Sequence, residues 1–575
     1  MELSESWKGG QTRHILVDPT DHHCFDMALQ WLENCAQKHP ICNAFKRDTF
    51  TPTRLVDVGP ETNTGIHICE QGNTQPLDQE RYVALSHCWG LSQHLVSIHS
   101  NINDWKENIP WDRLPRTFQE AISVTRRLGL RYIWIDSLCI IQDDAKDWDK
   151  EAAKMGMIYN QAYLVIAATS SIDGDGGILF DRLPYVTING RDQDQNPFQV
   201  FARKPCQHGP FTWGIPQSHA RRATRYGSGY STDPGYPLLT RAWCYQERLL
   251  GRRILHFTKD EMVFECLSSV NCECGAMTEF KDEWLLPARQ MVSSERHIGI
   301  SDLSLDRSSV LGKLPELILT REDSKDYDVF AEWRDMVSEY SQKNITHKSD
   351  WLPALGGIAS KWVSPITGDY LAGLWSRDLL RGLLWQPTSP DRTEKPSYIA
   401  PSWSWTSIQH PVKWIHGNNT EKFLVEIDLE RTSCIAKGVN KFGEVTAGWL
   451  FMTGSIAECT LDELSDNGTR GLLKIGLDSQ LGFSLDSFWR CEQYLGKKVY
   501  CLKYCTDLIT KFQSGVHRAL ILAPVEEDDE DFSRIPDSIR EYSPFCRRIG
   551  SLGHVEPDSW GLLDNVSTVR SFCLI

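Results

Sequence analysis

The segment Arg241-Ala-Trp-Cys-Tyr-Gln-Glu247 combines an indole and a carboxylate one helical turn apart. Trp243 and Glu247 stand at positions i and i+4, which share one face of a helix. The flat indole could stack on a heteroaromatic ring, and the carboxylate could stabilise positive charge that develops beside it. By spacing alone, the stronger interpretation is a tryptophan in the core and a glutamate paired with Arg248 or Arg252.

Three more polar segments each follow a short apolar run. They are Ser86-His-Cys-Trp-Gly90, Asp136-Ser-Leu-Cys-Ile140 and Ala168-Thr-Ser-Ser171. If the runs are parallel strands, these segments lie at the carboxyl ends of the strands, where α/β proteins bind ligands. On position alone, each segment is explained equally well by lining a pocket and by closing a turn.

The apolar runs alternate with helical patterns. Strands are predicted at 82–86, 132–135 and 163–168. A capping box, Thr117-x-x-Glu120, starts one predicted helix, which ends at Gly129, and Asp144 or Asp147 caps the next, over 148–162. Strands that alternate with helices predict right-handed crossovers and a parallel sheet covered on both faces.

The rest of the chain predicts further elements. We expect a helix near the N-terminus at 25–35, a helix at 241–250 and a hairpin of strands at 253–257 and 262–266. The apolar run 371–385 is interpreted as a core helix, and strand patterns dominate after residue 405. The expected parts are an N-terminal extension (1–79), an α/β domain (80–280), a mainly helical segment (281–400) and a β-rich C-terminal region (401–575).

Composition excludes several classes of protein. The net charge of −15 argues against a nucleic-acid partner. No apolar stretch approaches the roughly 18 residues of a membrane span, and the first residues lack the pattern of a secretory signal. The 18 cysteines are scattered through the chain, so reduced, mostly buried thiols are expected. These features predict a cytoplasmic protein.

Other chemical motifs are weak. Cys266-x5-Cys-x-Cys274 lacks the paired spacing of common zinc sites, so buried or loop thiols are favoured and no metal site is expected. His87 and Cys88 are adjacent on an extended strand end and point to opposite sides, which disfavours a nucleophile pair. The chain has no GxSxG, HExxH, phosphate loop or complete GxGxxG. We therefore expect no cofactor, and any NAD would not bind as in dehydrogenases.

Three ordered blocks resemble a known family. YVALSHCWG (82–90), the stretch from LPRTFQEA through YLVIAA (114–168) and RAWCYQERLL (241–250) are similar to the successive blocks of the fungal heterokaryon incompatibility (HET) domain. The later YLAGLWSRDLLRGLLW and APSWSWTS resemble the region that follows this domain. The family is associated with non-self recognition during fungal cell fusion and with programmed cell death.

The resemblance implies a fold and a reaction. HET domains are similar in fold to Toll/interleukin-receptor (TIR) domains, which implies a flavodoxin-like sheet. In enzymatic TIR domains, a Trp-Cys-x-x-Glu segment supplies the carboxylate that cleaves NAD at its nicotinamide glycosidic bond, and Trp243 to Glu247 has this form. The resemblance thus implies Glu247 as the catalytic residue and Trp243 as the nicotinamide-stacking residue. The ribose and phosphate side would be shaped by Ser86, Trp89, Gly90, Asp136 and Ser137.

The sequence therefore predicts an incompatibility and cell-death effector that acts through self-association or with an incompatibility partner protein. Hydrolysis of NAD, as a substrate and without a metal, is the accompanying hypothesis. Two alternatives stay open at this point. One is a signalling module without turnover, since fold resemblance does not establish chemistry. The other is an enzyme of secondary metabolism that has reused the same pocket.

Overall fold

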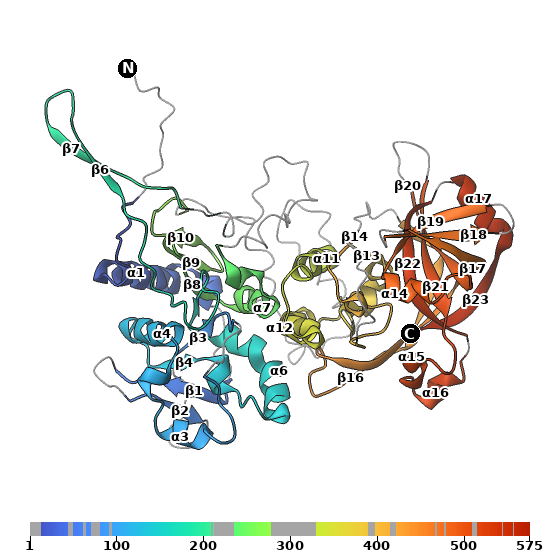
Figure 1. Ribbon diagram of the computed structural model, residues 1–575, viewed down its shortest axis with the longest axis horizontal. Helices are drawn as coiled ribbons and strands as arrows, with labels where there is room; N and C mark the ends of the chain where they lie inside the picture. Colours follow the sequence, from blue (N-terminus) through green and yellow to red (C-terminus); the bar gives the residue numbers. More distant parts are fainter. Residues whose placement is uncertain are drawn as a thin grey trace, which may run out of the picture. The chain divides into compact units, whose positions relative to one another are not determined.

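In a computed structural model, the chain has two compact units, residues 1–300 and 301–575, which are described separately (Figure 1). The described residues are 13–43, 50–60, 65–70, 81–90, 95–206, 208, 211, 235–277, 329–388, 397–414, 421–465, 469–475, 479–508, 515–542, 544–555 and 557–575. Within these ranges, no helix is both long and apolar enough to cross a bilayer. The four-part division expected from the sequence stays a prediction.

The first unit contains an eight-stranded sheet in the order β10-β9-β8-β5-β3-β4-β1-β2. Its strands are β1 (Arg54–Asp57), β2 (His67–Glu70), β3 (Tyr82–Ser86), β4 (Tyr132–Trp134), β5 (Leu164–Ala167), β8 (Arg253–Phe257), β9 (Met262–Cys266) and β10 (Val270–Cys272). The four central strands are parallel, as predicted. Both edges are antiparallel, so the sheet is mixed rather than parallel throughout.

Connection length explains the antiparallel β8–β9 and β1–β2 pairs at the two edges. Parallel neighbours need a crossover of a dozen or more residues, whereas antiparallel neighbours can follow a short turn. The turn between β8 and β9 is short, and it produces the predicted hairpin. At the other edge, β1 and β2 come from residues before 80 and pair with each other, and β1 also pairs with β4. Residues that were expected to form an extension therefore complete the sheet.

Helices cover both faces of this sheet, with α1 and α4 on one side and α6 and α7 on the other (Figure 1). The helices of the unit are α1 (His22–Lys38), α2 (Pro40–Asn43), α3 (Ile102–Glu107), α4 (Arg116–Arg127), α5 (Asp136–Cys139), α6 (Ala145–Gln161) and α7 (Ala242–Leu250). Residues 82–86, 132–134 and 164–167 are entirely buried, as expected for strands covered on both faces. The α/β prediction is confirmed.

The ends of the helices test the predicted caps. Asp144 accepts hydrogen bonds from the backbone of the first turn of α6, as predicted. The capping box at Thr117 is wrong, because α4 begins after Pro115 and has no side-chain cap. Thr117 Oγ1 instead accepts the N–H of Gly177, and Glu120 accepts the N–H of Ile178 at 2.5 Å. These two side chains therefore hold the loop that follows β5.

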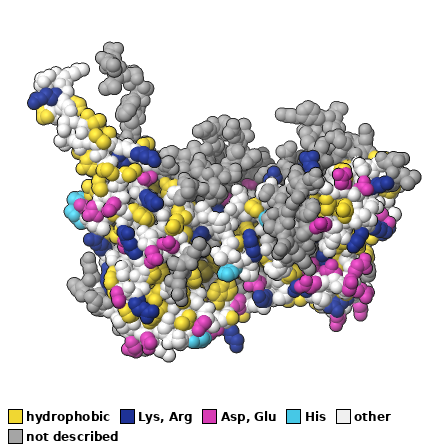
Figure 2. Space-filling model, viewed as in Figure 1, with side chains coloured by type: hydrophobic (Ala, Val, Ile, Leu, Met, Phe, Trp, Pro, Cys, Tyr) yellow, Lys and Arg dark blue, Asp and Glu magenta, His cyan; other side chains and the backbone are white. Residues whose placement is uncertain are grey.

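A hairpin of β6 (Val186–Arg191) and β7 (Pro197–Ala202) projects from the first unit (Figure 1). Register pairs Ile188 with Val200 and Gly190 with Phe198, so the side chains of Ile188, Val200 and Phe198 share one face. The exposed fractions of Ile188, Val200 and Phe198 are 51%, 48% and 44%. Figure 2 shows apolar side chains along this projecting hairpin.

The second unit begins its described part with α11 (Val329–Tyr340) and α12 (Pro353–Trp362), which belong to a tryptophan-rich core. The ring of Trp333 packs edge-to-face on Trp375 at 5.4 Å. The predicted helix at 371–385 is wrong. This run forms β11 (Tyr370–Leu371), β12 (Leu374–Trp375), the short α13 (Leu379–Gly382) and the start of β13 (Trp385–Pro387).

The turn between β11 and β12 explains the error. Ala372 and Gly373 have φ values of 43° and 93°, which a right-handed helix excludes. A Cβ atom on Gly373 would also lie 2.4 Å from the Trp405 indole nitrogen. The many apolar residues of this run reflect burial from several sides, which periodicity alone cannot distinguish from a buried helix.

The C-terminal part is mainly β, as predicted. Its described strands are β14 (Val412–Trp414), β15 (Glu421–Phe423), β16 (Val425–Ala436), β17 (Val445–Leu464), β18 (Arg470–Ile475), β19 (Ser479–Leu485), β20 (Lys498–Leu508), β21 (Gly515–Pro524), β22 (Phe545–Val555) and β23 (Ser567–Leu574). Pairings run from β17 through β18, β19, β22, β21 and β20 back to β17, which closes the sheet on itself. The apolar residues of these strands fill its interior.

One buried ion pair anchors this closed sheet. Arg548 donates to both carboxylate oxygens of Asp486, and both side chains have no exposed surface. The same guanidinium donates to the carbonyls of Leu383 and Trp385, at 2.5 and 2.6 Å. It also lies over the Trp385 ring. Arg548 thus ties β22 to the segment at 383–385, and its charge is balanced by Asp486.

Candidate functional site

The carboxyl ends of the central strands bring together two residues that are 161 positions apart. Ser86 ends β3, and its hydroxyl donates to Glu247 Oε2 on α7 at 2.5 Å. Glu247 is 4% exposed and Ser86 is also 4% exposed. The structure therefore joins the predicted carboxylate to the predicted strand-end serine within the protein interior.

The surroundings of Glu247 make its carboxyl group a weak acid. Burial raises its pKa, the hydroxyl of Ser86 lowers it, and the negative charge of Asp136 raises it again. Arg241 and Tyr159 act in the lowering direction. The result is a pKa of about 7. A carboxyl group with this pKa exchanges a proton near neutral pH, which suits a general acid or base.

Asp136 forms the second half of the site. The indole N–H of Trp89 donates to Asp136 Oδ2 at 2.8 Å, and the backbone N–H of Ser137 donates to Oδ1 at 2.7 Å. His87 Nδ1 lies 3.8 Å from the same carboxylate. Asp136 is partly exposed, with 18% of its side-chain surface accessible. The loop after β3 and the start of α5 are thus joined through one carboxylate.

The other predicted contact residues lie close by, but their environments differ. The side chain of Ser137 has no exposed surface, so it faces the interior. Gly90 is half-buried with a φ of +75°, and a Cβ atom there would lie 2.4 Å from Cβ of Asp173. Only glycine fits this close approach between the loops after β3 and β5. Ser137 and Gly90 therefore shape the backbone of the site.

Trp243 is half-buried near the start of α7, and its ring meets the Trp148 ring edge-to-face at 6.4 Å. The alternative partners of Glu247 are engaged elsewhere. Arg248 donates to Glu265 Oε2 at 2.9 Å, and Arg252 donates to Gln161. The interpretation in which one of these arginines is the main partner of Glu247 is therefore not favoured. The stacking role of Trp243 stays a prediction.

The comparison with known proteins names the region that carries this geometry. The family described as "Heterokaryon incompatibility protein (HET)" matches residues 82–247, from the first residue of β3 to Glu247 itself. The chain contains a HET domain. A relative from Neurospora crassa, "Heterokaryon incompatibility protein 6, OR allele", is 29% identical over 150 residues.

This similarity is local. The matched stretch covers 24% of this chain and 22% of the Neurospora protein, so the chain spans about a fifth of the relative's length. No solved structure matches the chain, and the likeness to TIR domains therefore stays a prediction. The matched residues include three of the four parallel strands, whereas β1, β2 and β8 to β10 lie outside them. Flanking residues thus complete the sheet of the HET domain.

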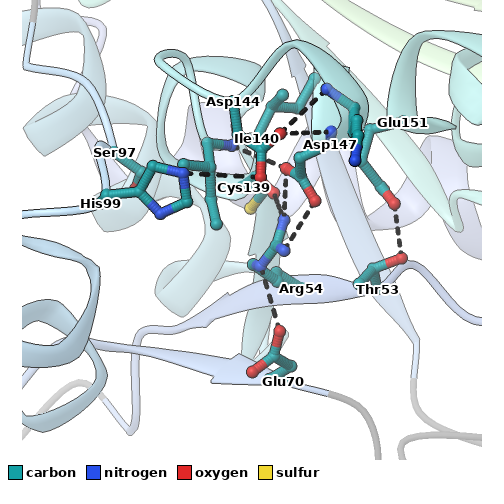
Figure 3. Close-up of polar contacts among 12 residues, drawn as sticks. Thr53, Arg54, Glu70, Ser97, His99, Cys139, Ile140, Asp144, Asp147 and Glu151 are labelled. Carbon is teal, nitrogen blue, oxygen red and sulfur yellow. Dashed lines mark hydrogen bonds and ion pairs between the residues drawn. The ribbon is translucent and has the colours of Figure 1, made fainter. Parts of the chain in front are cut away.

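One flanking residue helps to position the HET-domain site. Arg54 of β1 donates to both oxygens of Asp147, at 2.8 and 2.9 Å, and to the carbonyl of Cys139 at the end of α5 (Figure 3). On its other side, it lies 3.3 Å from Glu70. Asp147 also accepts the N–H of Ile141. Arg54 thereby fixes the short α5, whose first residue is Asp136.

The charge of Asp147 is stabilised by this arrangement. Burial raises the pKa of Asp147, but the hydrogen bonds from Arg54 and from the backbone of Ile141 lower it by more, so the net shift is downward. The carboxylate therefore stays ionised well below neutral pH. Glu151 and Thr53, drawn beside it in Figure 3, add a 2.7 Å hydrogen bond between α6 and the start of β1.

Two residues of the HET-domain site were missed from the sequence. Tyr159, buried on α6, donates to the carbonyl of Leu85 at 2.9 Å, and it lowers the pKa of Glu247. Arg241 precedes α7, and its positive charge acts on both Glu247 and Asp136. Arg241 opens the segment that suggested the site, so its charge was a usable signal. Tyr159 gave no sequence signal for the site, because it looks like one more apolar position of a helix.

The thiols at the site are poor nucleophiles. Burial raises the pKa of Cys88 to about 11 and places that of Cys244 well above its ordinary value. Both cysteines are therefore protonated at neutral pH. This agrees with the low rank given to a His87–Cys88 pair. The chemistry available here is that of the two carboxyl groups, supported by Ser86 and Arg241.

A cavity lies at the other end of the parallel strands. It has a volume of about 630 Å³ and is lined by residues including Arg81 before β3, Arg131 before β4 and Tyr163 before β5. Glu33 and Gln37 of α1 also line it. This cavity is separate from Glu247, which lies at the carboxyl ends of the strands. The predicted site therefore does not coincide with this hollow.

Proposed function

We propose that the chain is a fungal incompatibility effector whose HET domain triggers cell death by cleaving NAD. The HET-domain match and the name of the Neurospora relative support the incompatibility role. The chemistry rests on one observation, namely the buried Glu247 with a pKa of about 7, held by Ser86 at the carboxyl end of a central strand. The resemblance of Trp243 to Glu247 to the Trp-Cys-x-x-Glu segment of TIR domains selects NAD as the substrate.

In the proposed reaction, the bond between C1′ of the ribose and the nicotinamide nitrogen breaks, and its electron pair stays on nicotinamide. Nicotinamide leaves as a neutral molecule, so no proton donor is needed. The ionised carboxylate of Glu247 stabilises the oxocarbenium-like ribose. Water then adds to C1′, and its proton passes to Glu247 and on to solvent. The products are ADP-ribose, nicotinamide and one proton.

Ser86 and Arg241 would set the charge of the base. Both stabilise the carboxylate form of Glu247, whereas Asp136 opposes it. Because the carboxylate is the active form, turnover should rise as pH increases through about 7. Glu247 is 4% exposed, so hydrolysis requires a rearrangement that admits C1′ to the carboxylate.

Self-association belongs to the same proposal. The β6–β7 hairpin presents an apolar face formed by Val186, Ile188, Phe198 and Val200, which are 44% to 66% exposed. An exposed apolar face of this kind is typical of an interaction surface. We propose that a second copy of the chain covers it. Association would bring HET domains together at high local concentration.

The test is nicotinamide release from NAD by the purified full chain at high protein concentration. Wild-type protein should release nicotinamide, and Glu247→Gln should reduce the rate at least about 100-fold, the range expected for loss of one essential charge-stabilising group. Glu107→Gln, which removes an exposed carboxylate on α3, is the matched control and should keep the wild-type rate. No release from self-associated wild-type protein would remove the hydrolase proposal.

A second candidate function is favoured by the burial of Glu247. A carboxylate that is 4% exposed also suits a module that signals by assembly without turnover. Under this alternative, Glu247→Gln leaves cell killing intact when expressed in a fungal host, while substitutions on the hairpin face abolish it. Measuring killing and nicotinamide release with the same variants separates the two functions.

A further inference from the structure

Four potential metal ligands converge where the N-terminal helices meet the sheet. Cys35 lies in the last turn of α1, His39 is the residue that ends this helix, and Cys42 lies in α2. Cys266 is the last residue of β9. The three sulfur atoms and a ring nitrogen of His39 all lie within 4.8 Å of one another. Cys266 Sγ is 3.3 Å from His39 Nδ1.

These separations match a tetrahedral zinc site. Zn–S bonds of about 2.3 Å in a tetrahedron place neighbouring sulfur atoms about 3.8 Å apart, and a Zn–N bond of about 2.0 Å shortens the S–N separation slightly. Three cysteines and one histidine form a common ligand set of structural zinc sites. Cys35, Cys42 and Cys266 are 0%, 1% and 0% exposed, which suits a closed site that holds four protein ligands.

The groups around the sulfur atoms suit thiolates. Arg253 Nε donates to Cys35 Sγ at 3.2 Å, and the N–H of Ser268 donates to Cys266 Sγ at 3.4 Å. Three thiolates and a neutral histidine around Zn²⁺ carry a net charge of −1, which the guanidinium of Arg253 offsets. Hydrogen bonds of this kind orient metal ligands and tune their basicity. The three cysteines of the cluster, Cys35, Cys42 and Cys266, are free thiols rather than disulfides.

We propose that Cys35, His39, Cys42 and Cys266 bind a structural zinc ion that fastens α1 and α2 to β9. The spacing Cys35-x3-His39-x2-Cys42 supplies three ligands from one short stretch, and the fourth comes from 224 residues after Cys42 in the sequence. The sequence argument against zinc considered only Cys266 to Cys274, because nothing local connects this region to the N-terminal helix. This proposal does not depend on NAD cleavage.

A second cluster of potential ligands supports a zinc site independently of the first. Cys272 Sγ and Cys274 Sγ are 3.3 Å apart, and His208 Nε2 lies 3.4 Å from Cys274 Sγ. Glu261 Oε1 is 2.7 Å from the same histidine nitrogen. These four ligand atoms also lie within 4.8 Å of one another. We infer a second zinc site here, with two sulfur, one nitrogen and one oxygen ligand.

The first experiment measures zinc in the purified full chain by plasma mass spectrometry, without chelators during purification. Wild-type protein should contain two zinc ions per chain. Cys266→Ser should lose the first ion and Cys272→Ser the second, so each variant keeps one. Cys24→Ser, which changes another buried cysteine of α1 outside both clusters, is the matched control and should keep two. Unchanged zinc in Cys266→Ser would overturn the first site, and unchanged zinc in Cys272→Ser the second.

A second measurement needs no variant, in case a substitution prevents folding. X-ray absorption at the zinc edge of the wild-type chain should give Zn–S distances of about 2.3 Å and Zn–N or Zn–O distances of about 2.0 Å. Three sulfur ligands at one site and two at the other average to about 2.5 per ion. A shell of oxygen and nitrogen atoms alone, or wild-type protein purified without zinc, would overturn both sites. The nicotinamide assay is separate, so its failure leaves this result unaffected.

Discussion

Replacing Glu247 by glutamine should change how the stability of the first unit depends on pH. In the folded chain the pKa of Glu247 is about 7, against 4.5 for an unperturbed glutamate. The folded state therefore binds this proton more tightly than the unfolded state does. The stability that the neutral carboxyl group contributes is complete below about pH 4.5 and is lost as pH rises through about 7.

The size of the effect follows from the shift. A difference of about 2.5 pKa units at about 1.4 kcal/mol per unit gives about 3 kcal/mol, as an order of magnitude. Glutamine cannot ionise, so the variant should lack this pH-dependent loss. Its amide must still find a hydrogen-bond acceptor in the interior, which costs about 1–3 kcal/mol if it fails. The diagnostic quantity is therefore the slope with pH rather than the stability at one pH.

Hydrogen exchange in urea can follow the first unit alone within the full chain. Peptides that cover β3 and α7 report its free energy of opening between pH 5 and 8, after correction for the intrinsic exchange rate. Across this pH range, the free energy of opening of the wild-type first unit should fall by about 3 kcal/mol relative to that of Glu247→Gln. Ser86→Ala should move the loss to higher pH, because the Ser86 hydroxyl lowers the pKa of Glu247. Parallel curves for wild type and Glu247→Gln would refute a raised pKa.

Three other predictions concern parts of the molecule away from Glu247. Arg54→Met should destabilise the first unit by about 3 kcal/mol, because it leaves the largely buried Asp147 without its cation. In thermal unfolding, adding Asp147→Asn should recover part of this loss. An unchanged melting temperature for Arg54→Met would contradict the role of Arg54. Arg548→Met should lower the stability of the second unit by about 3–5 kcal/mol, because it leaves the fully buried Asp486 unpaired. Hydrogen exchange in β3 of the first unit should stay at the wild-type level. Equal losses of stability in both units would contradict this prediction. Ile188→Asp should lower self-association in sedimentation velocity without changing the melting temperature, since Ile188 is 51% exposed. Asn189→Asp, a change at the neighbouring exposed polar residue, is its control. If Ile188→Asp associates like the wild type, this face is not the self-association surface.

Local patterns predicted much of the first unit. The central strands are short runs of buried apolar residues, and the Asp144 cap of α6 depends on neighbours within three positions. The predicted helix at 371–385 failed because Ala372 and Gly373 adopt positive φ values, and the apolar residues on both sides of Gly373 hid this turn signal. The capping box failed because Thr117 and Glu120 bond to a loop about 60 residues later.

The site shows the same division between local and distant information. The i and i+4 positions of Trp243 and Glu247 were readable, but the hydrogen bond from Ser86 joins residues 161 positions apart. The strand β1 was missed because only its two middle residues are apolar, although all four of its residues are buried. The thiol cluster was missed for a comparable reason, since His39 and Cys266 are 227 positions apart.

The docking of α1 on β9 has a consequence for how the chain is made. Trp31 stacks on Phe264 at 6.1 Å, so the first helix finds its place only after the last strands of the unit have left the ribosome. At about 5–20 residues per second, synthesis of the intervening residues takes about 10–45 s. During this interval Cys35 and Cys42 are without their native surroundings. A nascent chain stalled before residue 262 should therefore expose both thiols to alkylation, whereas the finished chain protects them.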